Sequence, residues 1–402
     1  MKISLSVFIL LFPVFAVSYF YRLGESSFYL FDIFFIFICL FSIKNIYYKD
    51  FLRILTVSFG FVLVCSFGMI NNIINYNVNY ELDSFFAGVY RYFQFIYTLG
   101  FFVFFKGRIR KYNNMIHIFL LSISFPLLYS FVFYFLRPEQ VIVFNRLASY
   151  FGNPNYLGEY ICLSIFPIVY TISLLKGKVY FIFYILYFIF LLIFNLTFAG
   201  SNSYWLLSFF VLMMALVSLS ESLLHSMRII LPIFVLGVIG YLVFGKMQND
   251  EDFSGLSRTL ALFETLIEGG SVSSLGSGEL RSSLVDDAIA FILSSISNII
   301  FGIGIGQSPI IIGAMHGSYL TAHNAHIVLF MEMGGIGYLY FIGVLFYFIS
   351  KINLTKISLG FLFSYFVTIL ATPHVYMPFL WGVMVYGLFV YKISLIKSCS
   401  NK

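Results

Sequence analysis

Charged residues are scarce in this sequence. Only 10% of its 402 residues are Asp, Glu, Lys or Arg, whereas 61% are hydrophobic, and the mean hydropathy is +0.96. A soluble globular domain carries about a quarter charged residues, because it needs them to cover its surface. The shortage of charge therefore excludes a soluble protein and indicates a chain that lies in a lipid bilayer.

Cysteine is also rare. Of the 4 cysteines, Cys39, Cys65 and Cys162 lie within apolar runs and Cys399 lies in the C-terminal tail. No disulfide framework and no zinc-binding spacing is present, so we expect neither a metal nor another cofactor. The 23 Lys and Arg stand beside 53 Phe and 30 Tyr and form no basic face, so a nucleic acid partner is not expected.

Long apolar runs are plentiful and predict an all-α fold with about twelve transmembrane helices. Solid runs rather than alternating residues exclude a β-barrel. We expect spans near 3–21, 27–43, 51–70, 86–105, 115–136, 156–175, 178–197, 204–220, 228–245, 324–350, 354–371 and 375–395. The first run resembles a signal peptide, but it is longer than a usual signal core and opens a series of similar spans. We interpret it as an uncleaved helix.

The positions of Lys and Arg predict the orientation. With the N-terminus in the cytoplasm, 16 of the 23 fall on the inner side, 6 on the outer side, and Arg91 lies within a span. Both termini are then cytoplasmic. The chain divides into nine helices over residues 1–245, a large outer loop over 246–322, and three helices with a cytoplasmic tail over 323–402.

The outer loop is long enough for structure of its own. Leu256, Leu260, Phe263 and Ile267 follow helical spacing, and so do four residues further on: Leu284, Ala288, Ile292 and Ile296. Glycine and serine separate the two sets. We therefore expect two amphipathic helices that lie against the outer surface.

Three segments on the outer side carry polar residues that a purely structural bundle does not need. The first contains Arg146 and then Asn153, Pro154 and Asn155, directly before a span. Proline and asparagine suit a helix-start turn. An arginine beside a helix N-terminus suits either a lipid phosphate or a bound pyrophosphate.

The second segment surrounds Arg258 and Arg281, each at the start of a predicted amphipathic helix. Arg258 has Glu264 and Glu268 nearby and is most simply a solvated charge. Arg281 precedes a predicted helical stretch from Leu284 to Ile300. A Gly-Ile-Gly-Ile-Gly run over residues 302–306 follows this stretch. This run lacks the strand context of a dinucleotide site, so we expect it to turn the chain back toward the membrane.

The third segment gathers three of the six histidines. His316, His323 and His326 lie within 11 residues, and Asn324 stands between the last two. Histidine accepts a proton near neutral pH, which makes these residues candidate bases. A zinc site is the alternative, but no matching carboxylate or cysteine pattern accompanies them.

Asp32, Arg91, Glu159 and Glu332 are charged residues that we place inside the membrane. Burial of charge in a bilayer is costly, so each is a candidate functional residue, and a proton-coupled transporter is a rival to an enzyme. We expect Glu332 to be buried and to pair with Arg91 or with another span.

Taken in order, these motifs resemble the O-antigen polymerase and ligase superfamily of bacterial inner-membrane proteins. The resemblance lies in Arg146 with Phe-Gly-Asn-Pro-Asn at 151–155, in Arg281 before the glycine run, and in His323-Asn324 followed by Gly334 to Gly337. It is concentrated in residues 146–155 and 281–337, and the rest of the chain matches in hydropathy only.

The resemblance implies a glycosyltransferase that uses a glycan on undecaprenyl pyrophosphate and needs no metal. His323 matches the proposed base and Arg281 the arginine proposed to hold pyrophosphate. Arg146, Arg258, Asn153, Asn155, His316, Asn324 and His326 are the further candidate substrate-binding residues. One departure is Asn202, which stands where members often have arginine.

Within that superfamily we favour a polymerase, which joins lipid-linked repeat units at the outer face of the inner membrane. A ligase, which transfers the glycan to lipid A core, and a transporter of protons or lipid-linked oligosaccharides are the alternatives. The expected partners are undecaprenyl-pyrophosphate-linked oligosaccharides, membrane lipids, and a chain-length regulator and a flippase of the same pathway. The sugar repeat is not readable from the sequence.

Overall fold

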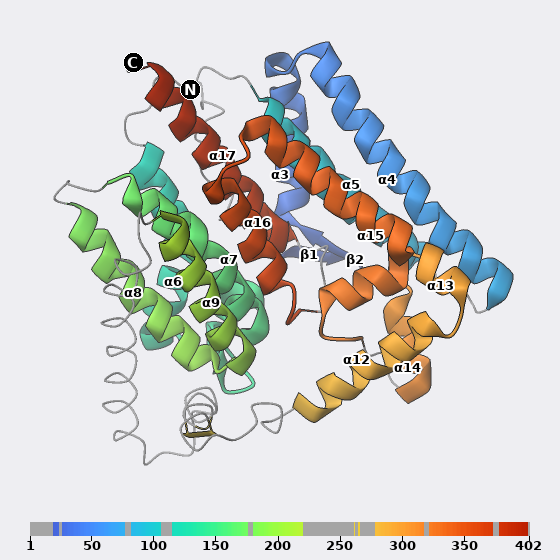
Figure 1. The fold of residues 1–402 in the computed structure, drawn as a ribbon. Helices are drawn as coiled ribbons and strands as arrows, with labels where there is room; N and C mark the ends of the chain where they lie inside the picture. Colours follow the sequence, from blue (N-terminus) through green and yellow to red (C-terminus); the bar gives the residue numbers. More distant parts are fainter. Residues whose placement is uncertain are drawn as a thin grey trace.

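Helices make up nearly all of the described chain in the computed structural model of this protein (Figure 1). The description covers residues 19–23, 26–76, 82–105, 115–175, 180–219, 261, 264–265, 278–316, 321–372 and 378–400. Within these ranges only two short hairpins accompany the helices. The expected all-α class is therefore confirmed.

The first described element is a hairpin. β1 (Tyr19–Leu23) pairs antiparallel with β2 (Ser26–Tyr29), directly before the first described helix. The prediction of helix up to residue 21 and again from residue 27 is therefore wrong at both ends. Tyrosine and phenylalanine fill these segments, and aromatic residues favour a strand where a partner strand lies alongside. The remainder of the predicted first span lies outside the described residues.

Long helices follow, and five are apolar and long enough to cross a membrane: Tyr48–Asn75, Ile116–Leu136, Pro154–Ser173, Tyr180–Ala199 and Ala325–Ile352. The helices are α3 (Leu30–Ser42), α4 (Tyr48–Asn75), α5 (Leu82–Phe104), α6 (Met115–Leu136), α7 (Pro154–Ser173), α8 (Tyr180–Ala199), α9 (Asn202–Leu219), α12 (Gly278–Leu293), α13 (Ile296–Phe301), α14 (Ser308–His316), α15 (Ala325–Ile352), α16 (Lys356–Thr368) and α17 (Pro378–Ser400). Short elements are η1 (Ile43–Asn45), η3 (Pro138–Gln140), β3 (Ile142–Val143), β4 (Arg146–Leu147) and η4 (Ser149–Phe151). The structure is that of a membrane-embedded helical protein. The total of twelve spans stays a prediction, since the span expected at 228–245 lies outside the described residues.

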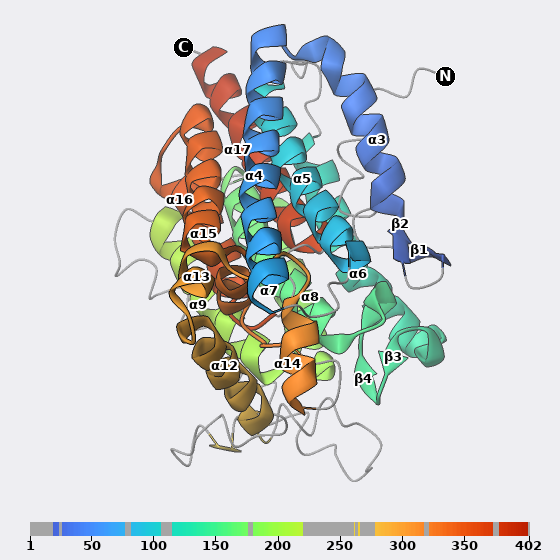
Figure 2. The ribbon, with the colours of Figure 1, turned by 90° about the vertical axis from the view of Figure 1, so that its right-hand side faces the viewer.

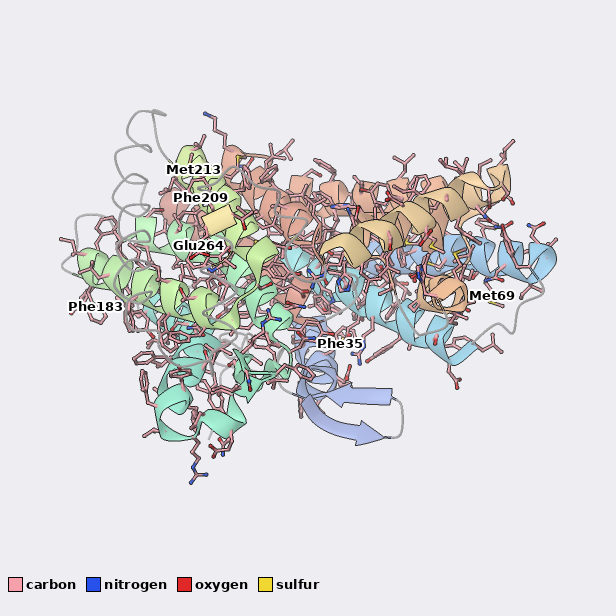
Figure 3. The ribbon with its side chains drawn as sticks, turned by 90° about the horizontal axis from the view of Figure 1, so that it is seen from below. Phe35, Met69, Phe183, Phe209, Met213 and Glu264 are labelled. Atoms are coloured by element: carbon pink, nitrogen blue, oxygen red, sulfur yellow. The ribbon has the colours of Figure 1, made fainter. Side chains whose placement is uncertain are left out.

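Two helices act as packing centres. α15 packs against α4, α5, α12 and α13, and α7 packs against α8, α9, α16 and α17. α17 also contacts α5 and so joins the two groups. Seen from below, Phe183 on α8 and Phe209 on α9 project from the outside of the bundle (Figure 3), where they are 62% and 42% exposed. Apolar side chains that face outward suit a surface covered by lipid.

Helices in a membrane gain little from hydrophobic burial against each other, so close packing through small residues matters more. Gly158 shows this between α7 and α9, because a Cβ there would lie 2.7 Å from the ring of Tyr204. Gly360 on α16 likewise leaves room for the ring of Phe166, which a Cβ would meet at 2.1 Å. These contacts bring α9 and α16 close to α7.

The two ends of the bundle are chemically different. At one end Lys392 donates to the carbonyls of Phe102, Val103 and Phe105, and Thr355 contacts the hydroxyl of Tyr391. The opposite end, lowest in Figures 1 and 2, carries α12, α14 and the β3–β4 hairpin. We call it the lower end, defined by the N-termini of α7, α9, α12 and α15 and the C-terminus of α16.

Candidate functional site

A network of hydrogen bonds joins the start of α7 to the junction between α8 and α9. Arg146 donates from Nε to the carbonyl of Ala199 at 2.7 Å and from one terminal nitrogen to the carbonyl of Gly200 at 3.1 Å. The same nitrogen reaches Oδ1 of Asn155 at 3.3 Å, which also accepts from the Ser201 hydroxyl at 3.3 Å. The guanidinium therefore satisfies carbonyls at the C-terminus of α8.

The turn before α7 forms as the sequence predicts. The Asn153 side chain accepts from the backbone N–H of Asn155 at 2.9 Å, and Pro154 occupies the first helical position. Asparagine at the N-cap and proline after it are a favourable start for a helix. Asn153 is therefore a capping residue, while Asn155 belongs to the network of Arg146.

One turn further along α7 lies Glu159, which is 1% exposed. Its Oε1 accepts a hydrogen bond of 2.8 Å from the Tyr204 hydroxyl of α9. The side chain of Thr372, beyond the end of α16, also lies within hydrogen-bonding reach, and Arg281 is close enough to interact electrostatically with the carboxylate. Glu159 thus lies between α7 and α9 and near the end of α16, with Arg281 of α12 within electrostatic range.

Arg281 stands in the first turn of α12. Leu284, Ala288 and Ile292 are buried, as their spacing predicts, and they pack in a small core with Ile303, Ile311, Ile312, Ala322, Val328 and Met331. Ile296 is 76% exposed, so its predicted place on that face is wrong. Ser295 ends the pattern, because its side chain caps α13 and begins a new helix. The other predicted amphipathic helix, with Arg258, lies outside the described residues apart from positions 261, 264 and 265.

The start of α15 is fixed to the end of α16. The Asn324 side chain accepts from the backbone N–H groups of His326 and Ile327, and Ala325 donates to the carbonyl of Ile369 at 3.0 Å. His323 directly precedes this cap. Since Ile369 is three residues from Thr372, the chain holds His323 near the segment after α16 that approaches Glu159.

His326 has a different environment from His323. Its Nε2 lies 3.0 Å from the Phe366 carbonyl and its Nδ1 lies 2.9 Å from the Tyr338 hydroxyl. A carbonyl only accepts, so Nε2 carries the proton and Nδ1 accepts from the tyrosine. The ring therefore links α15 to α16.

His316 is also held apart from the other two histidines. It lies at the end of α14, and its Nε2 is 2.8 Å from Oδ2 of Asp287 on α12. This contact ties α14 to α12. Among the described residues, no three His, Cys, Asp or Glu side chains gather in a way that could hold a metal ion.

The glycine run forms a tight contact between α15, α4 and the loop after α13. Ile303 and Gly304 donate to the carbonyls of Met331 and Glu332, and α15 bends at Gly334, whose φ is 63°. Gly302, Gly304 and Gly306 have positive φ values, whereas the expected return of the chain toward the membrane stays a prediction. Asn71 and Asn72 of α4 donate to carbonyls of the run and hold it in place.

Glu332 is buried as expected, with 1% exposure, but it does not pair with Arg91. Its Oε1 accepts from the Ser308 hydroxyl at 2.7 Å and lies 3.4 Å from the Ser308 backbone nitrogen, at the first turn of α14. A carboxylate at a helix N-terminus is favourable. The prediction of Arg91 as partner is wrong because another carboxylate lies closer to it.

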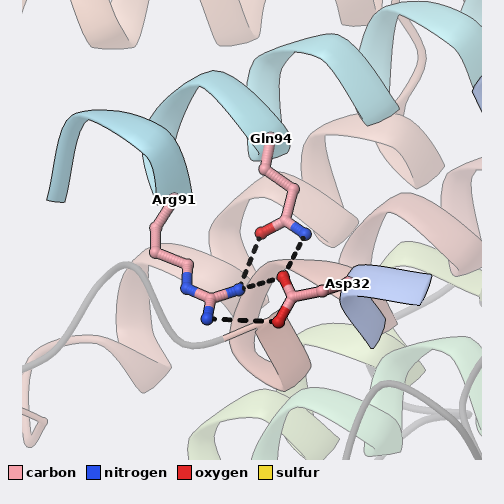
Figure 4. A network of polar contacts seen from close by, with 3 residues as sticks. All are labelled: Asp32, Arg91 and Gln94. Atoms are coloured by element: carbon pink, nitrogen blue, oxygen red, sulfur yellow. Dashed lines mark hydrogen bonds and ion pairs between the residues drawn. The ribbon is translucent and has the colours of Figure 1, made fainter. Parts of the chain in front are cut away.

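That carboxylate is Asp32 of α3, which reaches α5 (Figure 4). Arg91 donates to Oδ1 of Asp32 at 2.6 Å and to Oδ2 at 3.4 Å, and Gln94 donates to Oδ1 at 3.2 Å. Two bonds from the guanidinium fork and one from an amide satisfy the buried carboxylate. The network attaches α3 to α5.

The predicted site residues thus fall into two groups. The structure joins Arg146 to Asn155 and brings Arg281 near Glu159, with His323 at the adjoining junction. It separates His316 and His326, whose side chains connect helices. The sequence reasoning missed Ser201, Tyr204 and Thr372, since serine, threonine and tyrosine inside apolar runs give no spacing signal.

We define the polar cluster as Arg146, Asn155, Glu159, Ser201 and Tyr204. It follows one face of α7, because Asn155 and Glu159 are four residues apart. Arg281 approaches it from α12.

A comparison with models of known protein families finds no match, and neither does a comparison with curated proteins.

Proposed function

We propose that this protein transfers a glycan from a polyprenyl pyrophosphate carrier to a sugar hydroxyl, as an O-antigen polymerase of the bacterial inner membrane. The observation that carries the proposal is that the N-termini of α7, α9, α12 and α15 lie at the same end of the bundle, where Arg281 is within electrostatic range of Glu159. Helix N-termini and guanidinium groups both stabilise phosphate oxygens. A pyrophosphate leaving group is an anion that suits such a place.

In the proposed reaction the acceptor hydroxyl oxygen attacks the anomeric carbon of the donor sugar. The bond between that carbon and the pyrophosphate oxygen breaks, and the pyrophosphate leaves on its lipid with both bonding electrons. His323 takes the hydroxyl proton, and Arg281 stabilises the charge on the leaving group. One direct displacement inverts the anomeric configuration. No metal or organic cofactor has a step in this reaction.

The other candidate residues cap or connect the helices around the proposed site. Arg146 and Asn155 fix the helix ends below Glu159, and Asn153 and Asn324 cap α7 and α15. His326 holds α15 to α16, and His316 holds α14 to α12. Arg258, outside the described residues, remains a proposed second cation for the pyrophosphate.

The proposed chemistry is tested by measuring glycan transfer by the purified protein, with lipid-linked repeat units as the substrate. Removing a charge-assisted contact to phosphate in a partly desolvated site costs a few kcal/mol, so Arg281→Ala should lower turnover by about a hundredfold or more. Arg281→Lys should recover only part, because lysine lacks the bidentate fork. His323→Ala should abolish transfer. Arg137→Ala, which changes an exposed arginine after α6, should have no effect.

Deletion in the native cell tests the choice of acceptor. Loss of a polymerase leaves lipid A core with a single repeat unit and no ladder on a gel. Bare core with polymer left on the carrier would instead mean a ligase. Bare core without such polymer would mean a transporter. Wild-type turnover in Arg281→Ala at equal protein abundance would refute the assigned role of Arg281.

A further inference from the structure

One buried oxygen of the polar cluster is unused. Glu159 is 1% exposed, Tyr204 donates to its Oε1, and the Thr372 side chain lies near the carboxyl group, but Oε2 forms no hydrogen bond with the described residues. A buried acceptor that stays unpaired destabilises a protein by about 1–3 kcal/mol. Such an atom at a candidate site points to a ligand that supplies the missing donor.

The position of Glu159 limits which chemical groups can supply the missing hydrogen-bond donor. The residue is five positions into α7, about 8 Å from the helix start at 1.5 Å per residue. Arg281 is close enough to interact with it electrostatically, and the N-termini of four helices lie at the same end. A ligand here meets a positive environment and, beside it, a carboxylate oxygen that accepts. It therefore carries an anionic group next to a hydrogen-bond donor.

The direction of the carboxylate is fixed by its neighbours. Gly158 allows the Tyr204 ring to lie directly against α7, since a Cβ at 158 would meet that ring at 2.7 Å. The tyrosine hydroxyl then holds Oε1 and leaves Oε2 for another partner. Tyr204 is thus a positioning residue for Glu159.

Glu332 provides a useful contrast. It is equally buried and also has an Oε2 without a hydrogen-bond partner in the described part of the chain. Its Oε1, however, is held at the first turn of α14 by the Ser308 hydroxyl and backbone N–H. Glu332 is therefore a buried glutamate at a different helix start, and its replacement serves as a control for that of Glu159.

We propose that Glu159 binds the sugar joined to the pyrophosphate of the donor, by accepting a hydrogen bond from a hydroxyl or amide N–H of that sugar. The inference rests on the proposed function and adds to it the group that recognises the donor sugar. A fully ionised phosphate oxygen has no proton to donate, so it cannot pair with an oxygen that accepts. A sugar hydroxyl beside the phosphate does donate, and the proposed function assigns the anion to Arg281.

Two lipid probes separate the sugar from the phosphate: undecaprenyl pyrophosphate, and the same lipid carrying the repeat unit extracted from cells with the native gene. Affinity is measured for the purified full chain in lipid nanodiscs. Glu159→Met should weaken binding of the glycosylated lipid by about tenfold, because it removes the hydrogen bond from the sugar to Oε2. Binding of undecaprenyl pyrophosphate should be unchanged. Arg281→Ala should weaken the binding of both lipids to the same extent.

Further variants guard against a loss of folding. In Glu159→Gln the volume is kept and Tyr204 still has an oxygen to donate to, so the amide N–H₂ replaces Oε2. The same selective loss for the glycosylated lipid is expected, but smaller. Glu332→Gln, the matched change at the other buried glutamate, should leave both affinities at the wild-type value.

Each result decides between the two proposals. If neither lipid binds the wild type, the proposed function fails. If both bind and the Glu159 variants bind both as tightly as the wild type, the function stands and the role of Glu159 is wrong. An equal loss for both lipids in the Glu159 variants would also overturn it, because the carboxyl group would then act on the pyrophosphate.

Discussion

The bend of α15 at Gly334 should be intolerant of any side chain. Its φ is 63°, and a Cβ there would lie 2.4 Å from the Ile300 carbonyl oxygen and 2.5 Å from the Gly302 nitrogen. Both atoms belong to backbone, so no side-chain rotation relieves the clash. Holding a residue other than glycine in such a conformation costs about 1–3 kcal/mol.

The clash adds to this strain. To make room for the methyl group the loop has to move away from α15, which weakens the hydrogen bonds from Ile303 to Met331 and from Gly304 to Glu332. Each is worth about 0.5–1.5 kcal/mol. Gly334→Ala should therefore lower the free energy of unfolding by about 3–5 kcal/mol.

A matched control lies in the same helix. Gly343 has nothing within 4 Å of the place a Cβ would take, and it has ordinary helical backbone. Alanine there should stabilise α15 by up to about 1 kcal/mol. Unfolding of both purified variants in detergent, followed by circular dichroism against temperature, compares them directly. Equal unfolding temperatures would refute the contact between the glycine run and α15.

Other substitutions test the remaining contacts. Asp32→Ala should lower the free energy of unfolding by about 3–5 kcal/mol, because it leaves Arg91 buried without its carboxylate; adding Arg91→Leu should recover much of the loss, and no recovery in denaturation would count against the pair. Arg146→Ala should destabilise the protein by about 2–3 kcal/mol, since the Ala199 and Gly200 carbonyls lose a charged donor, and Arg146→Lys should restore only part in the same assay. His326→Ala should lower stability by about 1–3 kcal/mol, because its ring joins the Tyr338 hydroxyl to the Phe366 carbonyl, and unchanged unfolding would contradict this link between α15 and α16. A cysteine at Ser274, in a chain without its native cysteines, should react with an impermeant maleimide from outside the cell, and reaction from the cytoplasmic side alone would reverse the topology.

Local patterns in the sequence predicted several parts of the structure correctly. Apolar runs marked most of the described helices, Asn153 with Pro154 marked the start of α7, and the spacing of Leu284, Ala288 and Ile292 marked the buried face of α12. These features depend on residues within one or two helical turns. Gly302, Gly304 and Gly306 have φ values of 69°, 95° and 79°, which suit glycine.

Features that depend on distant residues were not predictable in the same way. Burial of Asp32, Glu159 and Glu332 followed from their place in apolar runs, but their partners come from other helices. The β1–β2 hairpin was missed because a run rich in tyrosine and phenylalanine suits a membrane helix as well as a strand. Spacing along one helix contains no information about which neighbour packs against it.

The candidate site is built from two groups of helices, and the contacts between these groups fix the positions of its residues. Glu159 and Tyr204 belong to the helices around α7, whereas Arg281 and His323 come from the segments around α15. Near the site, the Ala325–Ile369 hydrogen bond and the His326 contact with Phe366 join the two groups. A carboxylate and a guanidinium that must act on one ligand need a constant separation, so a change at this junction should weaken donor binding without touching either residue. The glycine run supports the same junction from the other side, since it fixes the first segment of α15 against α4.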